Sequence, residues 1–299
     1  MMTTEMLLLP FLFVFGACIG SFVNAFNWRY TENKSLLGRS QCPKCGHKLS
    51  AWELVPLVSY LLQKGRCLAC KKKISPRYPL VELIFALSFV FAGLWLLPRL
   101  NPDFLLPVNV GFAIYTFFIV SVFLALAASD LSWGIIPDRI VLPAIAFTFI
   151  YKSLDIAYRA TTTYFTLKND TGLGHYLLES GYFGNLVKDD LLGLAAALLL
   201  GAGIAGFFLL LIFLTRGRAM GLGDVKLGFL LGLALGFPAA LVGLALAFLT
   251  GALASVMLIL ASKKGLKETI PFGPFLALGG LVGLFYGDQL LNLYLSLMK

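Results

Sequence analysis

LGFLLGLALGFPAALVGLALAFLTGALASVMLILAS, residues 227–262, is a run of 36 residues without a formal charge between Lys226 and Lys263. A helix needs about 20 apolar residues to cross the bilayer core, so this run is long enough for two helices. Gly236-Phe237-Pro238 near its middle favours a break, because proline does not continue a helix interior. The run therefore predicts two membrane helices, one of them short.

Four other uncharged gaps have the length of one membrane span each. They hold 23 residues between Glu5 and Arg29, 26 between Asp103 and Asp130, 25 between Asp190 and Arg216, and 19 between Glu268 and Asp288. Two weaker candidates cover about residues 80–97 and 138–157, which gives about eight spans. The composition, 59% hydrophobic and 13% charged with a mean hydropathy of +0.86, excludes a disordered chain, a collagen-like chain and an ordinary cytosolic enzyme. The expected fold class is an all-α polytopic membrane protein.

Positive charge is concentrated in one segment. Eleven of the 24 Lys and Arg residues lie in residues 29–77, where only Glu32 and Glu53 oppose them. Nucleic-acid binding is one interpretation, but the positive-inside rule suits so apolar a chain better, and no nucleic-acid partner is expected. Threading the chain from a cytoplasmic 29–77 segment places 18 basic residues inside and six outside. The inside group includes Arg216, Arg218, Lys263, Lys264 and Lys267.

The sequence divides into three predicted parts. Residues 1–28 form the first transmembrane helix, residues 29–79 a polar module with cysteines, and residues 80–299 a helical membrane body. Residues 1–28 lack the basic n-region and cleavage site of a signal peptide, so we expect them to remain as a span with the N-terminus outside. Residues 158–190 are polar and are expected to form an outside loop with room for a short surface helix.

Small residues recur every four positions in two segments, which places each set on one helix face where backbones can approach closely. We interpret both sets as helix-packing faces rather than as ligand sites. The sets are Gly193, Ala197, Gly201 and Ala205, and Gly228, Gly232 and Gly236.

Four of the five cysteines form two C-x2-C hooks separated by 21 residues: Cys42, Cys45, Cys67 and Cys70. Four thiolates suit tetrahedral Zn²⁺ and leave no open position for water, so the predicted site is structural. Two disulfides are the alternative, but they need an oxidising compartment and the charge pattern places this module in the cytoplasm. Cys18 in the first span is expected to be a small buried residue. His47 is either a hydrogen-bond partner of the metal ligands or a plain surface histidine.

Ionisable residues at a membrane face are costly and are usually functional. The acids expected at the inner face are Glu82, Asp130, Asp138, Asp224 and Glu268. Asp130 lies at the end of the third predicted span, where the negative end of a helix disfavours an acid. Gly134 and Pro137 follow it and predict a break in the helix.

Asp224 closes the sequence Gly221-Leu-Gly223-Asp224, whose glycines let the backbone approach another group. A helix N-cap is the structural interpretation of Asp224, and it is compatible with a catalytic role. Two carboxylates that share a small site cannot both ionise easily, so one keeps its proton while the other acts as a base. That arrangement is aspartic protease chemistry, although proton-coupled transporters also use membrane carboxylates.

A series of motifs runs in order along nearly the whole chain. It comprises Gly20-Ser21-Phe22-Val23-Asn24 with Arg29, the four hook cysteines, Pro56-Leu-Val-Ser59-Tyr60-Leu, Gly65-Arg66-Cys67, Ile74 to Glu82, Asp130 with Ile136-Pro137-Asp138, and Gly221 to Lys226. In this order the motifs resemble those of the type IV prepilin peptidases, bacterial inner-membrane aspartic proteases of the Gly-x-Gly-Asp kind.

The resemblance implies a multi-pass enzyme of the bacterial inner membrane that cleaves the basic leader from type IV prepilins and pseudopilins. It implies Asp130 and Asp224 as the catalytic pair, with the active site and a zinc-ribbon-like module on the cytoplasmic side. It also implies N-methylation of the new N-terminus with S-adenosylmethionine as methyl donor. Asp138 is a motif neighbour, and it or Glu82 is available to help bind the basic leader.

Two alternatives remain at this point: a peptidase without methyltransferase activity, and a proton-coupled membrane transporter. A transporter would place its acids near the bilayer midplane rather than at span ends. The sequence leaves open which prepilins are processed, which residues bind the methyl donor, and the oligomeric state. Besides its substrate, the only partner that the sequence indicates is membrane lipid.

Overall fold

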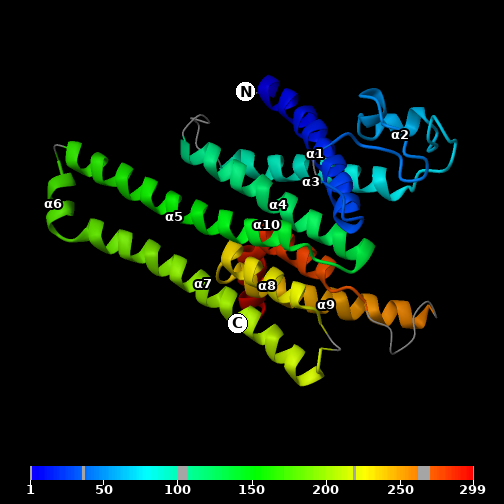
Figure 1. The fold of residues 1–299 in the computed structure, drawn as a ribbon. Coiled ribbons are helices and arrows are strands. Elements are labelled where there is room, and N and C mark those ends of the chain that lie inside the picture. Colours follow the sequence, from blue (N-terminus) through cyan, green and yellow to red (C-terminus); the bar gives the residue numbers. More distant parts are fainter. Residues whose placement is uncertain are drawn as a thin grey trace. The chain divides into compact units, whose positions relative to one another are not determined.

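The computed structural model describes residues 2–35, 38–99, 107–170, 172–217, 220–261 and 270–298 (Figure 1). Within these ranges the chain forms helices, turns and two isolated β-bridges, and no strand. The α-helices are α1 (Met2–Thr31), α2 (Val58–Leu62), α3 (Arg77–Leu96), α4 (Pro107–Trp133), α5 (Asp138–Asn169), α6 (Gly174–Glu179), α7 (Tyr182–Thr215), α8 (Leu222–Leu235), α9 (Ala239–Leu260) and α10 (Gly273–Leu297). Short 3₁₀ turns cover Trp52–Leu54 and Leu97–Arg99.

Seven helices in the described part of the chain are long and apolar enough to cross a membrane: α1, α3, α4, α5, α7, α9 and α10. Residues 227–260 of the long uncharged run lie in α8 and α9, which are separated at Gly236-Phe237-Pro238 as predicted. With 14 residues, α8 is the short helix of that pair. The all-α polytopic class with a cysteine module after the first helix is therefore confirmed.

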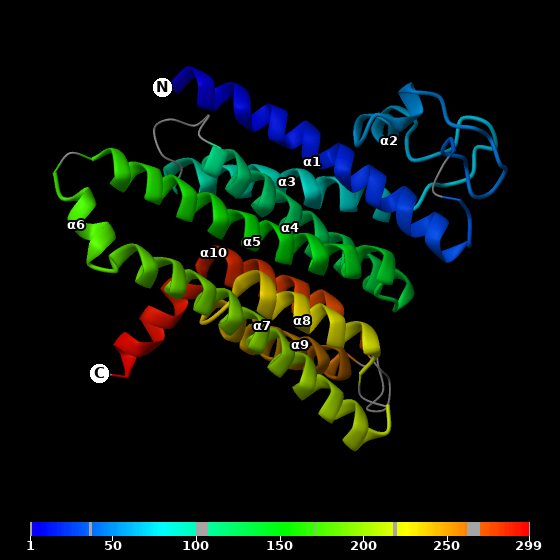
Figure 2. The ribbon, with the colours of Figure 1, turned by 60° about the vertical axis from the view of Figure 1, so that its left-hand side comes forward.

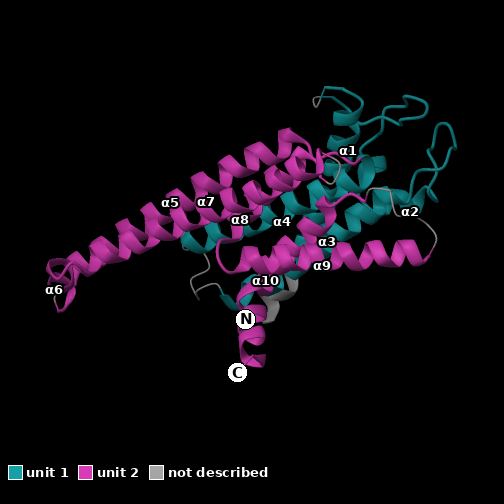
Figure 3. Ribbon diagram, turned by 90° about the horizontal axis from the view of Figure 1, so that it is seen from below, with its two compact units in different colours: residues 1–133 teal, residues 134–299 magenta. Residues whose placement is uncertain are grey.

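The chain forms two compact units, residues 1–133 and residues 134–299, coloured separately in Figure 3. This boundary falls between α4 and α5. The three-part division predicted from the sequence rests on polarity and cysteine content rather than on compactness, and it stays a prediction. Five of the charged residues that the sequence predicts at the inner face lie outside the described residues: Arg218, Lys263, Lys264, Lys267 and Glu268.

In unit 1, α3 packs antiparallel against both α1 and α4 (Figure 2). A Cβ added at Gly16 would lie 2.7 Å from the Phe85 carbonyl oxygen, so glycine lets α1 and α3 touch there. The side-chain amide of Asn24, further along α1, donates to the carbonyl oxygen of Tyr78 at 3.0 Å. The Arg77 guanidinium lies 4.1 Å from the centre of the Trp133 ring. The end of α1, the start of α3 and the end of α4 thus lie at one end of the unit.

In unit 2, the predicted packing faces are confirmed for Gly201, Gly228 and Gly232. A Cβ at Gly232 would overlap the backbone of Gly201, and one at Gly228 would lie 2.7 Å from the Phe208 ring. Close contact between α7 and α8 therefore requires these glycines. Gly193 differs, since a Cβ there would meet nothing within 4 Å.

The polar segment 158–190 differs from the predicted outside loop. Its first part continues α5 to Asn169, and α7 begins already at Tyr182, with only α6 between them. Arg159 bridges Asp155 at 2.9 Å and Asp190 at 3.5 Å, and so it ties α5 to α7. The threonine hydroxyls bond back to carbonyls one turn earlier, as from Thr166 to Thr162 at 2.9 Å. Polarity was a poor guide here because a helix satisfies its own backbone whether or not it lies in lipid.

Candidate active site and metal centre

Asp130 lies in the last turn of α4, at the end of unit 1 that also carries Arg77 and Trp133. Its exposed fraction is only 7%. The helix ends at Trp133, directly before Gly134, whose φ is +63°, so the break that the glycine and the proline predicted is present. The chain then runs without helix to Pro137 before α5 begins at Asp138. An acid is thus held buried at a helix end that favours positive charge.

Asp224 lies in the first turn of α8 and is 8% exposed. It is not the N-cap, as the structural interpretation had it. Gly221 occupies that position, and the Asp224 carboxylate accepts a hydrogen bond from the Gly221 N–H at 3.2 Å. A Cβ at Gly223 would lie 2.8 Å from the Ile136 side chain, so the glycine allows the loop to lie against the segment before α5.

An ion pair that the sequence analysis missed joins the two motifs inside unit 2. The Lys226 ammonium lies 2.6 Å from a carboxylate oxygen of Asp138, with side chains 34% and 52% exposed. It fastens the start of α5 to the start of α8, and so Asp138 has a structural partner of its own. The two residues are 88 positions apart. The available signal was a pair of opposite charges, each in or beside a motif that holds a candidate aspartate at the end of a predicted span.

The four hook cysteines are brought together. Their sulfur atoms all lie within 4.8 Å of one another, and no cysteine of the chain is in a disulfide. Zinc–sulfur bonds of about 2.3 Å in a tetrahedron place sulfurs about 3.8 Å apart, so the cluster fits Zn²⁺. Cys18, in contrast, is exposed on α1 and not buried as expected. Gly16 and Gly20 lie against α3, and a residue midway between them falls on the other side of the helix.

The two hooks have the same backbone turn. The Cys42 N–H donates to the His47 carbonyl at 2.9 Å, and the Cys67 N–H donates to the Lys72 carbonyl at 3.0 Å. In the second hook, the Cys70 N–H, helped by the Ala69 N–H and opposed by burial, lowers the pKa of the Cys67 thiol to about 7. Although the His47 N–H lowers it, burial and the three neighbouring cysteines raise the pKa of the Cys45 thiol to about 11. Of these two thiols, Cys67 therefore forms the metal-binding thiolate more readily.

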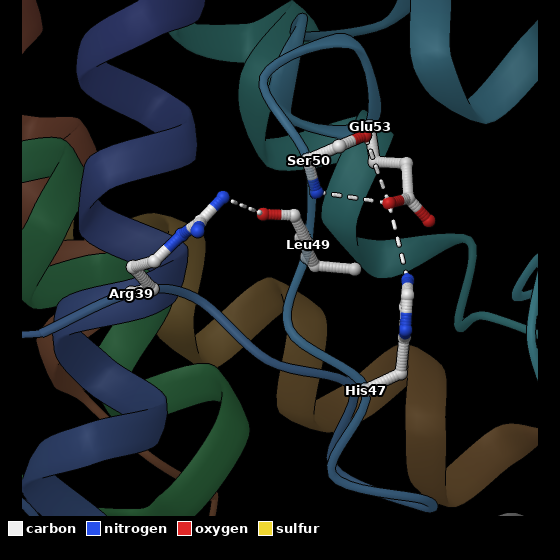
Figure 4. A network of polar contacts seen from close by, with 5 residues as sticks. All are labelled: Arg39, His47, Leu49, Ser50 and Glu53. Atoms are coloured by element: carbon white, nitrogen blue, oxygen red, sulfur yellow. Dashed lines mark hydrogen bonds and ion pairs between the residues drawn. The ribbon is translucent and has the colours of Figure 1, made fainter.

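A small polar network closes the loop after the first hook (Figure 4). One oxygen of Glu53 accepts hydrogen bonds from the Ser50 N–H at 2.9 Å and the Ser50 hydroxyl at 3.0 Å, and it lies 3.3 Å from the His47 ring nitrogen. The Ser50 N–H, together with the other two groups, holds the pKa of the Glu53 carboxyl below its usual value. His47 is therefore neither free on the surface nor directed at the metal ligands through its ring, because the ring meets Glu53.

The structure describes Asp130 and Asp224 in different units, so their catalytic pairing stays a prediction.

Two family models match parts of the chain. Residues 14–96 match the family described as Bacterial Peptidase A24 N-terminal domain, and residues 117–256 match the Type IV leader peptidase family. No solved structure matches the chain.

Curated relatives cover most of the sequence. A protein of Bacillus subtilis (strain 168) is 30% identical over 97% of this chain and 99% of its own length. A protein of Aeromonas salmonicida (strain A449) is 32% identical over 87% of this chain and 76% of its own. A third, from Pseudomonas aeruginosa, is 29% identical over 94% and 91%. All three are named prepilin leader peptidase/N-methyltransferase.

Proposed function

Since the chain belongs to the type IV leader peptidase family, we propose that it cleaves the leader from type IV prepilins or pseudopilins and then methylates the new N-terminus with S-adenosylmethionine. The observation that carries the proposal is the pair of buried acids, Asp130 and Asp224, each within a motif of that family at the end of a helix. The protein has seven helices of membrane-spanning length among its described residues, which agrees with a substrate that is itself anchored in the bilayer.

Cleavage would follow the logic of a shared-proton carboxylate pair. The ionised carboxylate takes a proton from a water molecule, which attacks the scissile carbonyl carbon. The protonated partner donates a hydrogen bond to the carbonyl oxygen and then gives its proton to the leaving amine. We assign these roles to Asp130 and Asp224 as a pair and not individually, because the proton belongs to both.

We place this chemistry at the cytoplasmic face. The support is the distribution of basic residues, 18 inside against six outside, with eleven of them in residues 29–77. In unit 1 the cysteine module leaves and re-enters the helices at the same end as Asp130. A prepilin whose basic leader lies in the cytoplasm and whose apolar helix lies in the bilayer presents its scissile bond at that level.

Zinc at the four hook cysteines would be structural. Four thiolates complete the tetrahedron, so the metal would hold the loop and leave no position for substrate or water. The folded loop would then lie beside the end of α1, which precedes it, and the start of α3, which follows it.

The proposal is tested with purified protein, a full-length prepilin and labelled S-adenosylmethionine. We expect a smaller pilin on a gel and label retained on the mature pilin. Cleavage without label would leave only the peptidase half. A pilin that is neither shortened nor labelled, as in a no-enzyme control, would contradict both halves. A reporter fused near Lys72 should read as cytoplasmic and one near Asp170 as external. The reverse pattern would overturn the proposed face.

A further inference from the structure

Within the cysteine module, exposed apolar side chains are concentrated in one segment. Seven large apolar side chains of the described residues 38–76 are exposed, and six of them lie within residues 52–62, which hold the turn Trp52–Leu54 and the helix α2. The six are Trp52, Leu54, Val55, Val58, Leu61 and Leu62. Single exposed apolar side chains are ordinary, but a cluster of this density is typical of an interaction surface.

The helix α2 has two different faces. Val58, Leu61 and Leu62 are spaced i, i+3 and i+4, so they share one face, and the two leucines are 73% and 78% exposed. Tyr60 falls on the opposite face and lines a cavity of about 740 Å³ between the module, α1 and α3. Trp52, in the turn before α2, is 84% exposed. One side of the segment thus belongs to the interior of unit 1, and its apolar side is uncovered among the described residues.

The same segment lies beside the membrane helices. The Leu57 N–H donates to the Glu82 carboxylate at 2.8 Å, and Glu82 is five residues inside α3, which is about 7.5 Å along the helix axis. Leu54 lines a second pocket, of about 400 Å³, together with Phe22 on α1. Phe22 lies about 10 Å along α1 from Arg29, the basic residue of its last turn. Residues 52–62 therefore reach the level at which lipid headgroups meet the acyl chains.

We infer that residues 52–62 insert into the surface of the bilayer and anchor the cysteine module to anionic lipid headgroups, a role that does not depend on the proposed catalysis. Residues 38–76 hold eight Lys and Arg residues and one acid, Glu53. The Glu53 side chain is only 5% exposed and accepts hydrogen bonds from Ser50, so the outward charge of the module is positive. Clusters of Lys and Arg beside a membrane helix are attracted to anionic lipid.

Charge also distinguishes the bilayer from other occupants of this surface. A second copy of the module would bring the same positive charge to the contact, and the like charges would repel each other. The basic leader of a prepilin would be repelled in the same way. Anionic headgroups supply the opposite charge instead, and the acyl chains below them accept the leucines. Tryptophan is enriched at this boundary, which suits the exposed ring of Trp52.

Lipid would give these side chains the apolar surroundings that the module lacks. Among the described residues 38–79, only Cys42 and Cys67 are buried apolar side chains. Exposed leucines in water are unfavourable in proportion to their apolar area, so insertion removes a cost that the folded module cannot remove by itself. A lysine beside an inserted segment keeps its ammonium group at the level of the headgroups, and Lys64 lies only two positions after Leu62.

Fluorescence of Trp52 tests the location. Full-length protein is reconstituted in nanodiscs of phosphatidylcholine and phosphatidylglycerol, with or without bromine on the acyl chains, and the Trp52 emission is the difference between the wild type and Trp52→Phe. We expect bromine near the top of the chains to quench most of this emission, and the water-soluble quencher acrylamide to quench little of it. Quenching by acrylamide and not by bromine would place Trp52 in water and overturn the insertion. Protection from both quenchers would show that protein covers Trp52, and it would overturn the insertion equally.

Two matched variants test the apolar contact. Leu61→Glu places a charge on the exposed face of α2, and Leu68→Glu places the same charge on an exposed leucine of the second hook, beyond residues 52–62. We expect Leu61→Glu to lose most of the quenching of Trp52 by brominated lipid and Leu68→Glu to retain it, with zinc content equal in both. Quenching that both variants retain, or that both lose, would contradict an insertion through the apolar face of α2.

Lipid composition and salt test the charge. The distance over which charges act in solution falls from about 10 Å at 0.1 M salt to about 3 Å at 1 M. We expect weaker quenching of Trp52 in brominated phosphatidylcholine without phosphatidylglycerol, and weaker quenching at high salt. Equal quenching in the neutral and the anionic lipid would contradict the binding of anionic headgroups. These measurements do not involve prepilin conversion, so the anchor and the proposed function can fail separately.

Discussion

The cysteine module and the membrane helices are held together by different means. Between Gly38 and Pro79 the only buried apolar side chains among the described residues are those of Cys42 and Cys67, whereas α3 and α4 bury whole rings such as Phe89 and Phe123. The module depends instead on hook turns, the Glu53 network and its thiolate cluster. The helices depend on small residues that allow close packing. With the proposed zinc in place, one region would be held by a metal, whereas the other needs glycine at particular contacts.

Removal of a zinc ligand should have the largest effect, because it should unfold the cysteine module and leave the helices folded. Cys42→Ser or Cys67→Ser leaves three thiolates, and structural zinc is worth about 10–16 kcal/mol in small zinc modules. We expect zinc to fall from one per chain to near zero, and limited proteolysis to cut within residues 38–79 while the helices stay protected. Elemental analysis and mass spectrometry of the fragments measure both.

Cys18→Ser is the matched control, since this exposed cysteine on α1 is outside the cluster. It should keep its zinc and its protease resistance. A wild-type protein that contains no zinc, has its hook thiols oxidised in pairs and resists the protease equally well would show that disulfides hold the module.

Glycine substitutions in α7 and α8 should change the stability by an intermediate amount. The direction of the change should depend on which glycine is replaced. Gly232→Ala drives a methyl group into Gly201, and overpacking of this kind costs about 1–3 kcal/mol. Gly203→Ala meets nothing within 4 Å and should stabilise its helix by up to about 1 kcal/mol, because alanine is the better helix former. Thermal unfolding in the same detergent compares them. Equal shifts in the same direction would show that the α7–α8 contact does not depend on glycine.

The smallest effect is expected at the two hook turns. The corresponding positions are Gly46 with φ +72° and Lys71 with φ +57°, so the second hook holds a lysine where a left-handed backbone favours glycine. Gly46→Ala should weaken the folded hook by about 1 kcal/mol, and Lys71→Gly should be neutral or strengthen it by less than that. Competition with a chelator measures zinc affinity, where 1 kcal/mol is about fivefold. Weaker zinc binding by Lys71→Gly would mean that the lysine side chain itself supports the turn.

The sequence predicted most of what depends on composition and spacing. Uncharged runs located the spans, Gly236-Phe237-Pro238 located the break between α8 and α9, and the hook spacing identified the four cysteines that cluster. The sequence did not predict the side-chain contacts that form where loops fold back. The pair of Asp138 with Lys226 and the contact of His47 with Glu53 depend on how loops return to helices, and local patterns do not encode that.

The helical extension of α5 beyond residue 157 shows a second limit. Its polar residues suggested a loop, but Arg159 finds Asp155 and Asp190, and the helix continues. Hydropathy reports where a helix can enter lipid and says little about where the helix ends. Local breakers were more reliable than polarity, since α4 ends directly before Gly134, as the glycine and proline after Asp130 predicted.

Prepilin conversion by Asp130→Asn and Asp224→Asn tests the central claim most directly, because an amide can act neither as the base nor as the acid of the pair. Each variant, normalised to the amount of enzyme in the membrane, should lose cleavage, and the double variant should be no worse than either, since one loss already disables the unit. Asp138→Asn is the matched control. It removes only a partly exposed ion pair with Lys226, worth about 0–1 kcal/mol, and should cleave at close to the normal rate. Near-normal conversion by either the Asp130 or the Asp224 variant would contradict the two-aspartate account.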